Sequence, residues 1–220
     1  YWFVFQVGLR SIAPGQYGDM PYLVWIMCGL IPWFFFSDGI NSVTSVFLEY
    51  SYLVKKVVFD IKILPVIKII SATFVHIFFI FLIFIIMALF GYMPTLCYIQ
   101  AFYYSICMIC LILAIGYFTS SISVFFRDLP QFVQVCLSAG MWLTPIMWPF
   151  EMLQGYWFSF IFKLNPMFYV VEGYRSAILG HQWLFSNWKL TIYFWCVVVV
   201  LTLIGRNVFK KMKPHFADVL

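Results

Sequence analysis

The stretch Phe125-Phe126-Arg127-Asp128-Leu129-Pro130 places a short charged break between two apolar runs. The apolar segment that follows ends in Leu143-Thr144-Pro145-Ile146-Met147-Trp148-Pro149, and a half-polar segment then continues to Gly180. A proline-broken, aromatic-rich hairpin after an apolar helix is typical of a channel mouth in a bilayer, because irregular backbone at membrane depth must be covered by protein or face water. The stretch therefore predicts a membrane protein whose outer hairpin closes on a transmembrane helix.

The composition of the 220-residue chain excludes a soluble domain. Hydrophobic residues make up 65% and charged residues 10%, whereas soluble domains average about 45–50% and about 25%. The apolar residues form several long runs, which excludes a single anchor attached to a soluble domain. The net charge of +5 does not indicate nucleic-acid binding, because the lysines and arginines are confined to a few loops.

Six membrane spans are predicted, because about 20 apolar residues are needed to cross about 30 Å of hydrocarbon. The predicted ranges are 1–9 (partial), 22–47, 69–90, 96–124, 132–148 and 188–204. The first range is too short to cross alone and begins inside an apolar run, so we expect further residues upstream. The predicted fold class is therefore an all-α polytopic membrane protein, with one transmembrane domain over residues 1–220.

Two connecting segments carry unusual patterns. The range 48–62 interrupts the hydrophobicity with Glu49, Asp60 and several lysines but keeps an apolar side. It predicts a short amphipathic helix at a membrane face. Two interpretations remain open, an interfacial loop with snorkelling lysines or a coupling helix that docks into a cytoplasmic partner. The range 150–187 is predicted to be an outward re-entrant hairpin.

Charge bias predicts the orientation of the chain. The 48–68 loop, the 126–130 turn and the C-terminus together hold nine Lys and Arg residues, whereas the alternating loops hold four. By the positive-inside rule the first set faces the cytoplasm. Both termini are therefore expected in the cytoplasm, and the hairpin is expected to face outward.

Polar residues inside the predicted spans are few. Asp38, Asn41, Ser42 and Ser45 recur at helical spacing and so share one helix face. This stripe predicts either hydrogen bonding between helices or a polar strip on a translocation path. His76 stands alone among apolar residues and is interpreted as a packed, hydrogen-bonded side chain rather than a ligand or proton carrier.

The chain carries no pattern for chemistry of its own. It has no Gly-x-x-x-x-Gly-Lys-[Ser/Thr] loop to hold nucleotide phosphates. It also lacks the paired carboxylates or His cluster that a metal-dependent lipid-phosphate enzyme needs, and Cys107-x-x-Cys110 has no nearby His or carboxylate. We therefore predict no catalytic residue, no metal and no cofactor on this chain. Transport against a concentration gradient would therefore need energy from a partner protein.

Six motifs in the right order resemble the membrane subunit (permease) of ABC-2 type exporters, in the branch that moves lipid-linked polysaccharides and teichoic acids. They are Pro32-Trp33-x-Phe35-Phe36-Ser37, Leu53-Val54-x-Lys56-Val57-x-Phe59 followed by Ile63-Leu64-Pro65, Phe126-Arg127-Asp128-Leu129, Thr144-Pro145-Ile146-x-Trp148-Pro149, Asn165-Pro166, and the tail from Phe209 to Asp218. The chain departs from the family pattern at Asp60, where Pro is usual. The resemblance covers nearly the whole chain.

The resemblance implies half of a transporter. Two copies of the chain would form a channel, and two copies of a separate ATPase chain would bind ATP and Mg and move the coupling helices. The implied ATPase-interface residues are Leu53, Val54, Lys55, Lys56, Val57, Phe59, Arg127 and Asp128. The candidate substrate path comprises Trp33, Asp38, Asn41, Trp142 and Trp148, and the re-entrant hairpin carries Asn165, Pro166, Glu172 and Arg175.

Several of these roles have alternatives. An interfacial belt or helix packing is the alternative explanation for the tryptophans. Two interpretations of Arg127 remain open, a local ion pair with Asp128 or a contact with the ATPase. Glu172 and Arg175, spaced for an ion pair on a helix, predict either a structural lock of the hairpin or contact with an anionic head group or polymer phosphate.

The implied cargo is a polyprenyl-diphosphate-linked polymer that crosses the cytoplasmic membrane of a bacterium, with teichoic acid favoured over O-antigen or capsule. The expected partners also include membrane lipids but no nucleic acid. Three rival functions remain: a drug- or lipid-exporting permease of the same family, a channel or scaffold that works without an ATPase, and a membrane enzyme acting on polyprenyl phosphates.

Overall fold

The computed structural model describes residues 22–54, 60–92, 95–153, 155–157, 159–180, 183 and 188–219. This part of the chain is all-α and contains no strand. Its long helices are α1 (Tyr22–Thr44), α4 (Ile63–Leu89), α5 (Gln100–Ser123), α6 (Leu129–Leu143), α8 (Pro166–Ile178) and α9 (Trp188–Met212), and its short ones are α2 (Val46–Glu49), α3 (Ser51–Val54), η3 (Leu96–Ile99), η4 (Phe150–Leu153), α7 (Ser159–Lys163), η6 (Lys213–His215) and α10 (Phe216–Val219). The predicted fold class is confirmed.

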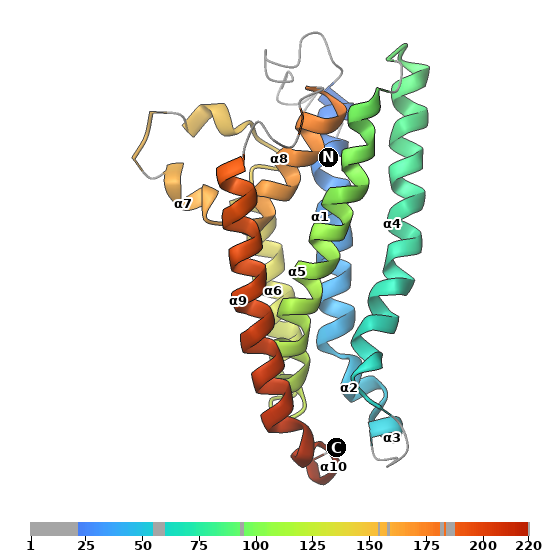
Figure 1. Ribbon diagram of the computed structural model, residues 1–220, viewed down its shortest axis with the longest axis vertical. Helices are drawn as coiled ribbons and strands as arrows, with labels where there is room; N and C mark the ends of the chain where they lie inside the picture. The colour runs from blue at the N-terminus through green and yellow to red at the C-terminus, as the bar shows by residue number, and fades with distance from the viewer. Residues whose placement is uncertain are drawn as a thin grey trace.

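The long helices α1, α4, α5, α6 and α9 run side by side along the longest axis of the molecule (Figure 1). Two ends follow from this arrangement. The basal end carries α2, α3 and α10, and the hairpin end carries α7 and α8 (Figure 1). Helix α5 lies at the centre of the bundle, where it packs against α1, α8 and α9.

Four described helices are long and apolar enough to cross a membrane, namely Tyr22–Thr44, Ile63–Leu89, Leu96–Ser123 and Trp188–His215. In two of them, α4 and α9, only 22% of the most apolar stretch is buried inside the bundle. On α4, for example, Phe74 is 72% exposed and Leu89 is 81% exposed. Apolar surface of this extent requires a covering of lipid or protein, as expected for a polytopic membrane protein.

The predicted fifth span differs from the observed helix. We predicted residues 132–148, but α6 begins at Leu129 and ends at Leu143. The cause is Pro145, which disfavours helical backbone at the residue before it. Thr144 is accordingly extended, with φ −87° and ψ 133°. With 15 residues, α6 is about 22 Å long, too short to cross about 30 Å of hydrocarbon alone.

Other boundaries also moved. Helix α1 ends at Thr44 rather than at 47, α4 spans Ile63–Leu89 rather than 69–90, and α9 continues to Met212 rather than to 204. Pro65 is compatible with the early start of α4, because a proline in the first turn of a helix removes no helical hydrogen bond. Helix α9 continues beyond residue 204 because the lysines and the arginine that follow are good helix formers. The predicted first span, 1–9, lies outside the described residues.

Small residues allow α1 and α5 to approach closely. A side chain at Gly116 of α5 would collide with Val43 of α1. Beside it, the Ser123 hydroxyl donates to the carbonyl of Thr44 at 2.7 Å, and the hydroxyls of Thr44 and Thr119 are 2.8 Å apart. The hydroxyl groups of Thr44, Thr119 and Ser123 are therefore hydrogen-bonded across the helix pair.

Candidate functional site

The basal end joins three segments that are far apart in the sequence. Phe47 of α2 packs against Phe209 of α9 and Phe216 of α10, with ring centroids 5.8 and 5.3 Å apart. Phe125, at the turn into α6, contacts the same Phe216 with a centroid distance of 6.1 Å. The buried members of this basal cluster are Val46, Phe47, Val54, Ile61, Leu64, Val124, Phe209 and Phe216. The three segments predicted to share one membrane face therefore lie together.

Charged groups surround the basal cluster. Asp60 lies 3.8 Å from the Lys62 ammonium and 3.4 Å from that of Lys213, and its Oδ1 also accepts from the Lys62 backbone N–H. This backbone hydrogen bond, then the charges of Lys62 and Lys213, hold the pKa of Asp60 below its ordinary value against the opposing effect of burial. Asp60, the position at which the family pattern has a proline, therefore joins the start of α4 to the C-terminal segment.

The predicted coupling residues separate into three groups. Leu53 and Val54 of α3 turn inward, since Val54 is buried in the basal cluster and Leu53 packs against it. Their apolar side chains gain more from this cluster than from solvent, so Val54 is covered by the chain itself, whereas Leu53 stays partly exposed. Lys55, Lys56, Val57 and Phe59 lie outside the described residues.

Arg127 and Asp128 stand at the tip of the α5–α6 turn and are both exposed. The described part of the chain provides no ion pair for either, so the local pair considered from the sequence does not form. Asp128 occupies the N-cap position of α6 but accepts no capping hydrogen bond. Of the predicted interface residues in the described ranges, these two are the most exposed.

The predicted amphipathic helix over 48–62 is not one helix in the described residues. Tyr50 separates α2 from α3, and a turn at Asp60–Lys62 leads into α4. The Glu49 side chain accepts from the Ser45 hydroxyl and from the Lys68 ammonium, the latter at 2.6 Å. Lys68 also lies 5.2 Å from the ring centroid of Tyr50. These contacts tie the interrupted segment to the start of α4.

We predict that the Glu49–Lys68 pair makes stability pH-dependent. Burial acts to raise the pKa of Glu49, but the hydrogen bonds from Lys68 and Ser45 outweigh it and leave the pKa below the ordinary value of 4.5. A depressed carboxyl pKa stabilises the fold above the unfolded value, and this contribution is lost as the pH falls through the folded value. Lys68→Met should therefore lower stability by about 1 kcal/mol or less at pH 7.

The check is the melting temperature of the purified protein between pH 7 and pH 3.5. The difference between the wild-type protein and Lys68→Met should shrink below about pH 4.5, the ordinary value for Glu49. Lys62→Met is the matched control, because the Lys62 ammonium is 59% exposed and 3.8 Å from its partner, and it should have a smaller effect at pH 7. A difference that stays constant down to pH 3.5 would contradict the prediction.

A groove between α1, α5 and α6 contains one residue of the predicted path, Trp33, together with the predicted hairpin residues Asn165 and Pro166. Its volume is about 450 Å³, and its walls include Trp33, Phe132, Gly140, Asn165 and Pro166. Trp33 is buried, and a side chain at Gly140 would press against its ring at 3.1 Å. None of the residues of α6 is fully buried, and Phe132 is 62% exposed. The groove is therefore aromatic, and one of its walls is only partly covered.

The other predicted path residues lie elsewhere. The indole N–H of Trp148 donates to the backbone carbonyl of Trp142 at 3.1 Å, and its ring meets Phe162 of α7 at right angles. Trp142 itself is 60% exposed. Neither tryptophan lines the groove that contains Trp33. The three tryptophans expected to share one path thus divide between a groove wall and the hairpin end.

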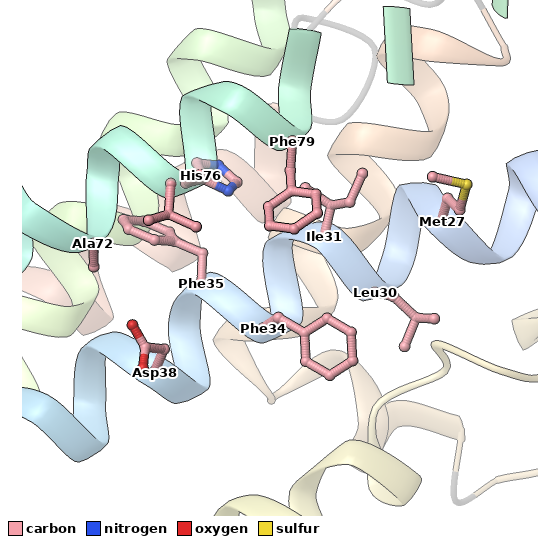
Figure 2. Close-up of a pocket in the computed structure, with 10 residues that line it drawn as sticks. Met27, Leu30, Ile31, Phe34, Phe35, Asp38, Ala72, His76 and Phe79 are labelled. Atoms are coloured by element: carbon pink, nitrogen blue, oxygen red, sulfur yellow. The ribbon is translucent and has the colours of Figure 1, made fainter. Parts of the chain in front are cut away.

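The polar stripe on α1 does not act as one unit. Asp38 is exposed and lines a second groove, between α1 and α4 (Figure 2). Asn41 is partly buried, and its backbone carbonyl accepts from the Ser45 hydroxyl at 3.3 Å. Ser45 in turn bonds to Glu49 of α2. The lower part of the stripe therefore serves local helix contacts, whereas Asp38 faces outward.

The hairpin is closed by a buried arginine. Arg175 of α8 is 1% exposed and donates to the carbonyls of Pro145 and Ile146, both at 2.6 Å. Its guanidinium also stacks on the ring of Trp25, 3.8 Å from the centroid. A fork of donors suits two adjacent carbonyls that the break after α6 leaves without helical partners. This geometry supports the structural lock considered from the sequence.

Two neighbours complete the lock. Glu172 lies 3.8 Å from Arg175 on the same face of α8 and is 30% exposed, as the spacing of the two residues predicted. Asn165 caps α8 by accepting from the N–H of Met167, while its amide donates to the hydroxyl of Thr144 at 2.9 Å. The predicted hairpin residues Asn165, Glu172 and Arg175 therefore meet at the break that follows α6.

Sequence reasoning missed the partners of His76. Its Nε2 lies 2.9 Å from the Tyr174 hydroxyl and 3.2 Å from that of Ser105, and its ring stacks on Phe35 with centroids 4.3 Å apart. This confirms the interpretation of a packed, hydrogen-bonded side chain. Neither Tyr174 nor Ser105 carries a motif, and only the packing of α4 and α8 against α5 brings them to the histidine.

Comparison with known proteins agrees with this arrangement. Residues 1–179 match the model of the family described as ABC-2 type transporter. Two proteins described as O-antigen export system permease protein RfbA of Klebsiella pneumoniae are each 27% identical over 226 residues, covering 100% of this chain and 82% of theirs. A protein of the same description from Myxococcus xanthus is 24% identical over 219 residues, covering 99% of this chain and 81% of its own. The chain therefore belongs to the ABC-2 type transporter family.

Proposed function

We propose that this chain is the transmembrane subunit of an ATP-driven exporter that moves a polyprenyl-diphosphate-linked polysaccharide across the cytoplasmic membrane of a bacterium. Family membership supports a permease that works with an ABC ATPase subunit. The observation that carries the proposal is the gathering of α2, the α5–α6 turn and the C-terminal segment in one basal cluster. A force applied there reaches α1, α4, α5, α6 and α9 together.

The ATPase would bind at the basal end. Arg127 and Asp128 project from it, and Lys210 and Lys211 are exposed in the last turn of α9. Movement of a partner against this end would tilt α6, which is held less tightly than its neighbours because none of its residues is fully buried. ATP binding can shift the channel between two states only if the ATPase contacts the basal end more tightly in one state than in the other.

A second copy of the chain would complete the channel. The uncovered wall of the groove is α6, whose outer face exposes Phe132, Val135 and Leu143. This short helix cannot seal a bilayer by itself, and a second copy would supply the missing cover. The aromatic groove behind it suits sugar rings, because aromatic faces contact carbohydrate with little directional demand and allow a polymer to slide.

The cargo follows from the relatives rather than from the geometry. The curated relatives are described as O-antigen export permeases, which favours an O-antigen-like polysaccharide. Teichoic acid, the cargo favoured by the sequence motifs, is the second candidate. Both are polymers carried on a polyprenyl diphosphate, so they share the anchor and differ in the charge of the repeat.

Charge reversal at Arg127 tests the ATPase contact. We predict that Arg127→Glu lowers the amount of ATPase that co-purifies with the tagged chain by about tenfold or more, because an interfacial arginine commonly contributes about 2 kcal/mol. Lys189→Glu is the matched control, because Lys189 is also exposed but lies in the first turn of α9, at the hairpin end. Co-purification measured by quantitative mass spectrometry decides the outcome.

Equal ATPase recovery for the two variants would refute basal docking, as would a wild-type chain that transports without any ATPase.

The cargo is tested separately in inverted membrane vesicles supplied with ATP. Uptake of a lipid-linked neutral polysaccharide, of a lipid-linked teichoic acid and of small hydrophobic drugs is compared. Uptake of the drugs alone would favour the drug-exporting branch of the family.

A further inference from the structure

A second groove lies between α1 and α4, on the outside of the bundle and away from the groove that holds Trp33. Its volume is about 270 Å³, and every lining residue except Asp38 and His76 is apolar (Figure 2). An engineered apolar cavity of about 150 Å³ takes a benzene ring, so this groove has room for a hydrocarbon of on the order of ten carbon atoms. Its mouth is bordered by Phe34 and Phe79, which are 54% and 42% exposed.

The groove is elongated along the helices. On α1 it runs from Met27 to Asp38, a distance of about 16 Å at the rise of an α-helix, and on α4 it runs from Ala72 to Phe79 (Figure 2). A narrow apolar slot that opens sideways from a transmembrane bundle receives its occupant from the lipid phase. The shape fits a single extended hydrocarbon chain better than a ring system or a polymer.

One wall is held in place before anything binds. His76, at the middle of the groove, is fixed by Tyr174 and Ser105 at its Nε2 and by the stacked ring of Phe35. These contacts pin α4 to α5 and α8. A preformed site loses less conformational freedom on binding than one that must be ordered.

The polar end of the groove carries negative charge. Asp38 is exposed and lies six residues, about 9 Å, before the end of α1 at Thr44. A carboxylate at the outer face of a span is costly without a cationic partner. Lys68, one turn below Ala72, donates its hydrogen bond to Glu49 at 2.6 Å. Among the described residues no ammonium or guanidinium lies within 4 Å of the Asp38 carboxylate, so a cation from outside the chain would balance it.

We propose that this groove binds one acyl chain of a phospholipid whose head group carries a primary ammonium, with the ammonium beside Asp38. The apolar slot accounts for the chain, and the excess carboxylate accounts for the head group. The diphosphate head group of the exported polymer's lipid anchor carries only negative charge, so the carboxylate of Asp38 disfavours it at this mouth. The site is independent of which polymer the chain transports, and it would stabilise α4 against α1 in the membrane.

The test counts the lipids retained by the purified exporter complex. The complex is exchanged into nanodiscs of equal parts phosphatidylethanolamine, phosphatidylcholine and phosphatidylglycerol, released into mild detergent and analysed by native mass spectrometry. We expect one tightly held phosphatidylethanolamine per chain, preferred at least about fivefold over the other two lipids. Phosphatidylcholine has a similar net charge but no ammonium hydrogen to donate, so it separates hydrogen bonding from charge alone.

Two variants locate the site. Ala72→Trp fills the groove and should reduce the retained lipid at least about tenfold, whereas Ala88→Trp, at an exposed position on the same helix but outside the groove, should not. Asp38→Asn preserves the shape and should abolish the preference for phosphatidylethanolamine while a lipid is still retained. Because Asp38 is exposed, this variant keeps the test valid even where Ala72→Trp impairs folding.

Three results would overturn the proposal. They are a preference for phosphatidylglycerol in the wild-type protein, an unchanged preference in Asp38→Asn, or a folded Ala72→Trp that loses its second copy instead of its lipid. The last result would assign the groove to an interface between chains. Co-purification of the ATPase is recorded in the same preparations, so a failure of lipid binding is distinguished from a failure of the proposed transport function.

Discussion

Arg175→Met is expected to lower the free energy of unfolding by about 3–5 kcal/mol, the typical effect of breaking a buried charged network. The variant removes two hydrogen bonds of 2.6 Å to the carbonyls of Pro145 and Ile146 and the stacking on Trp25. Methionine fills a similar volume but donates no hydrogen bond, so both carbonyls lose the partner that Arg175 supplies. For a chain of this size the melting temperature should fall by roughly 10 °C.

Glu172→Gln is the control for this prediction. It removes one ion pair of 3.8 Å at a side chain that is 30% exposed and should cost less than about 1 kcal/mol. Arg175→Lys keeps the charge but loses the two-pronged donor, and its melting temperature should fall between those of the other two variants. The measurement is the thermal unfolding of each variant in the same detergent. A melting temperature for Arg175→Met within about 2 °C of the wild-type value would exclude the lock.

Gly205→Leu is expected to separate α9 from α5. A Cβ atom at Gly205 would lie 2.7 Å from the carbonyl oxygen of Ala114 and 3.3 Å from the amide of Phe118, and both of these are backbone atoms that cannot rotate away. Leucine is the better helix former by about 1 kcal/mol. Destabilisation would therefore show that packing between the helices outweighs the propensity of the helix itself. We expect a loss of about 3 kcal/mol or more.

The separation should be visible at the basal end, since α9 delivers Phe209 to the basal cluster, where it meets Tyr117 of α5 with ring centroids 5.6 Å apart. Limited proteolysis after the last turn of α9 should become faster in Gly205→Leu than in the wild-type protein. Val200→Leu, at a position of the same helix that is 54% exposed, should leave the cleavage rate unchanged. Equal rates in all three proteins would mean that α5 and α9 tolerate a wider spacing.

The charge pattern of the sequence correctly grouped the segments at the basal end but did not predict the direction of their side chains. The excess of lysine and arginine placed the 48–68 loop, the 126–130 turn and the C-terminus on one side. Val54, Ile61 and Leu64 of that loop lie in one cluster with Phe209 and Phe216, and Phe125, directly before the turn, contacts Phe216. The pattern did not show that Leu53 and Val54 turn inward, because an apolar side chain on an amphipathic segment fits its own chain and a partner equally well. Only the position of Phe209 and Phe216 decided between them.

Local sequence determined the fold class, the long apolar helices and the break at Pro145, because hydrophobic length and proline geometry act over neighbouring residues. The tertiary structure alone decided that Arg175 meets the carbonyls of that break, that His76 meets Tyr174 and Ser105, and that Asp38 lines a groove opposite Ala72. Each of these contacts joins residues at least 29 positions apart. No motif or charge pattern pairs these residues with one another, so the contacts become visible only when the packing of whole helices brings the side chains together.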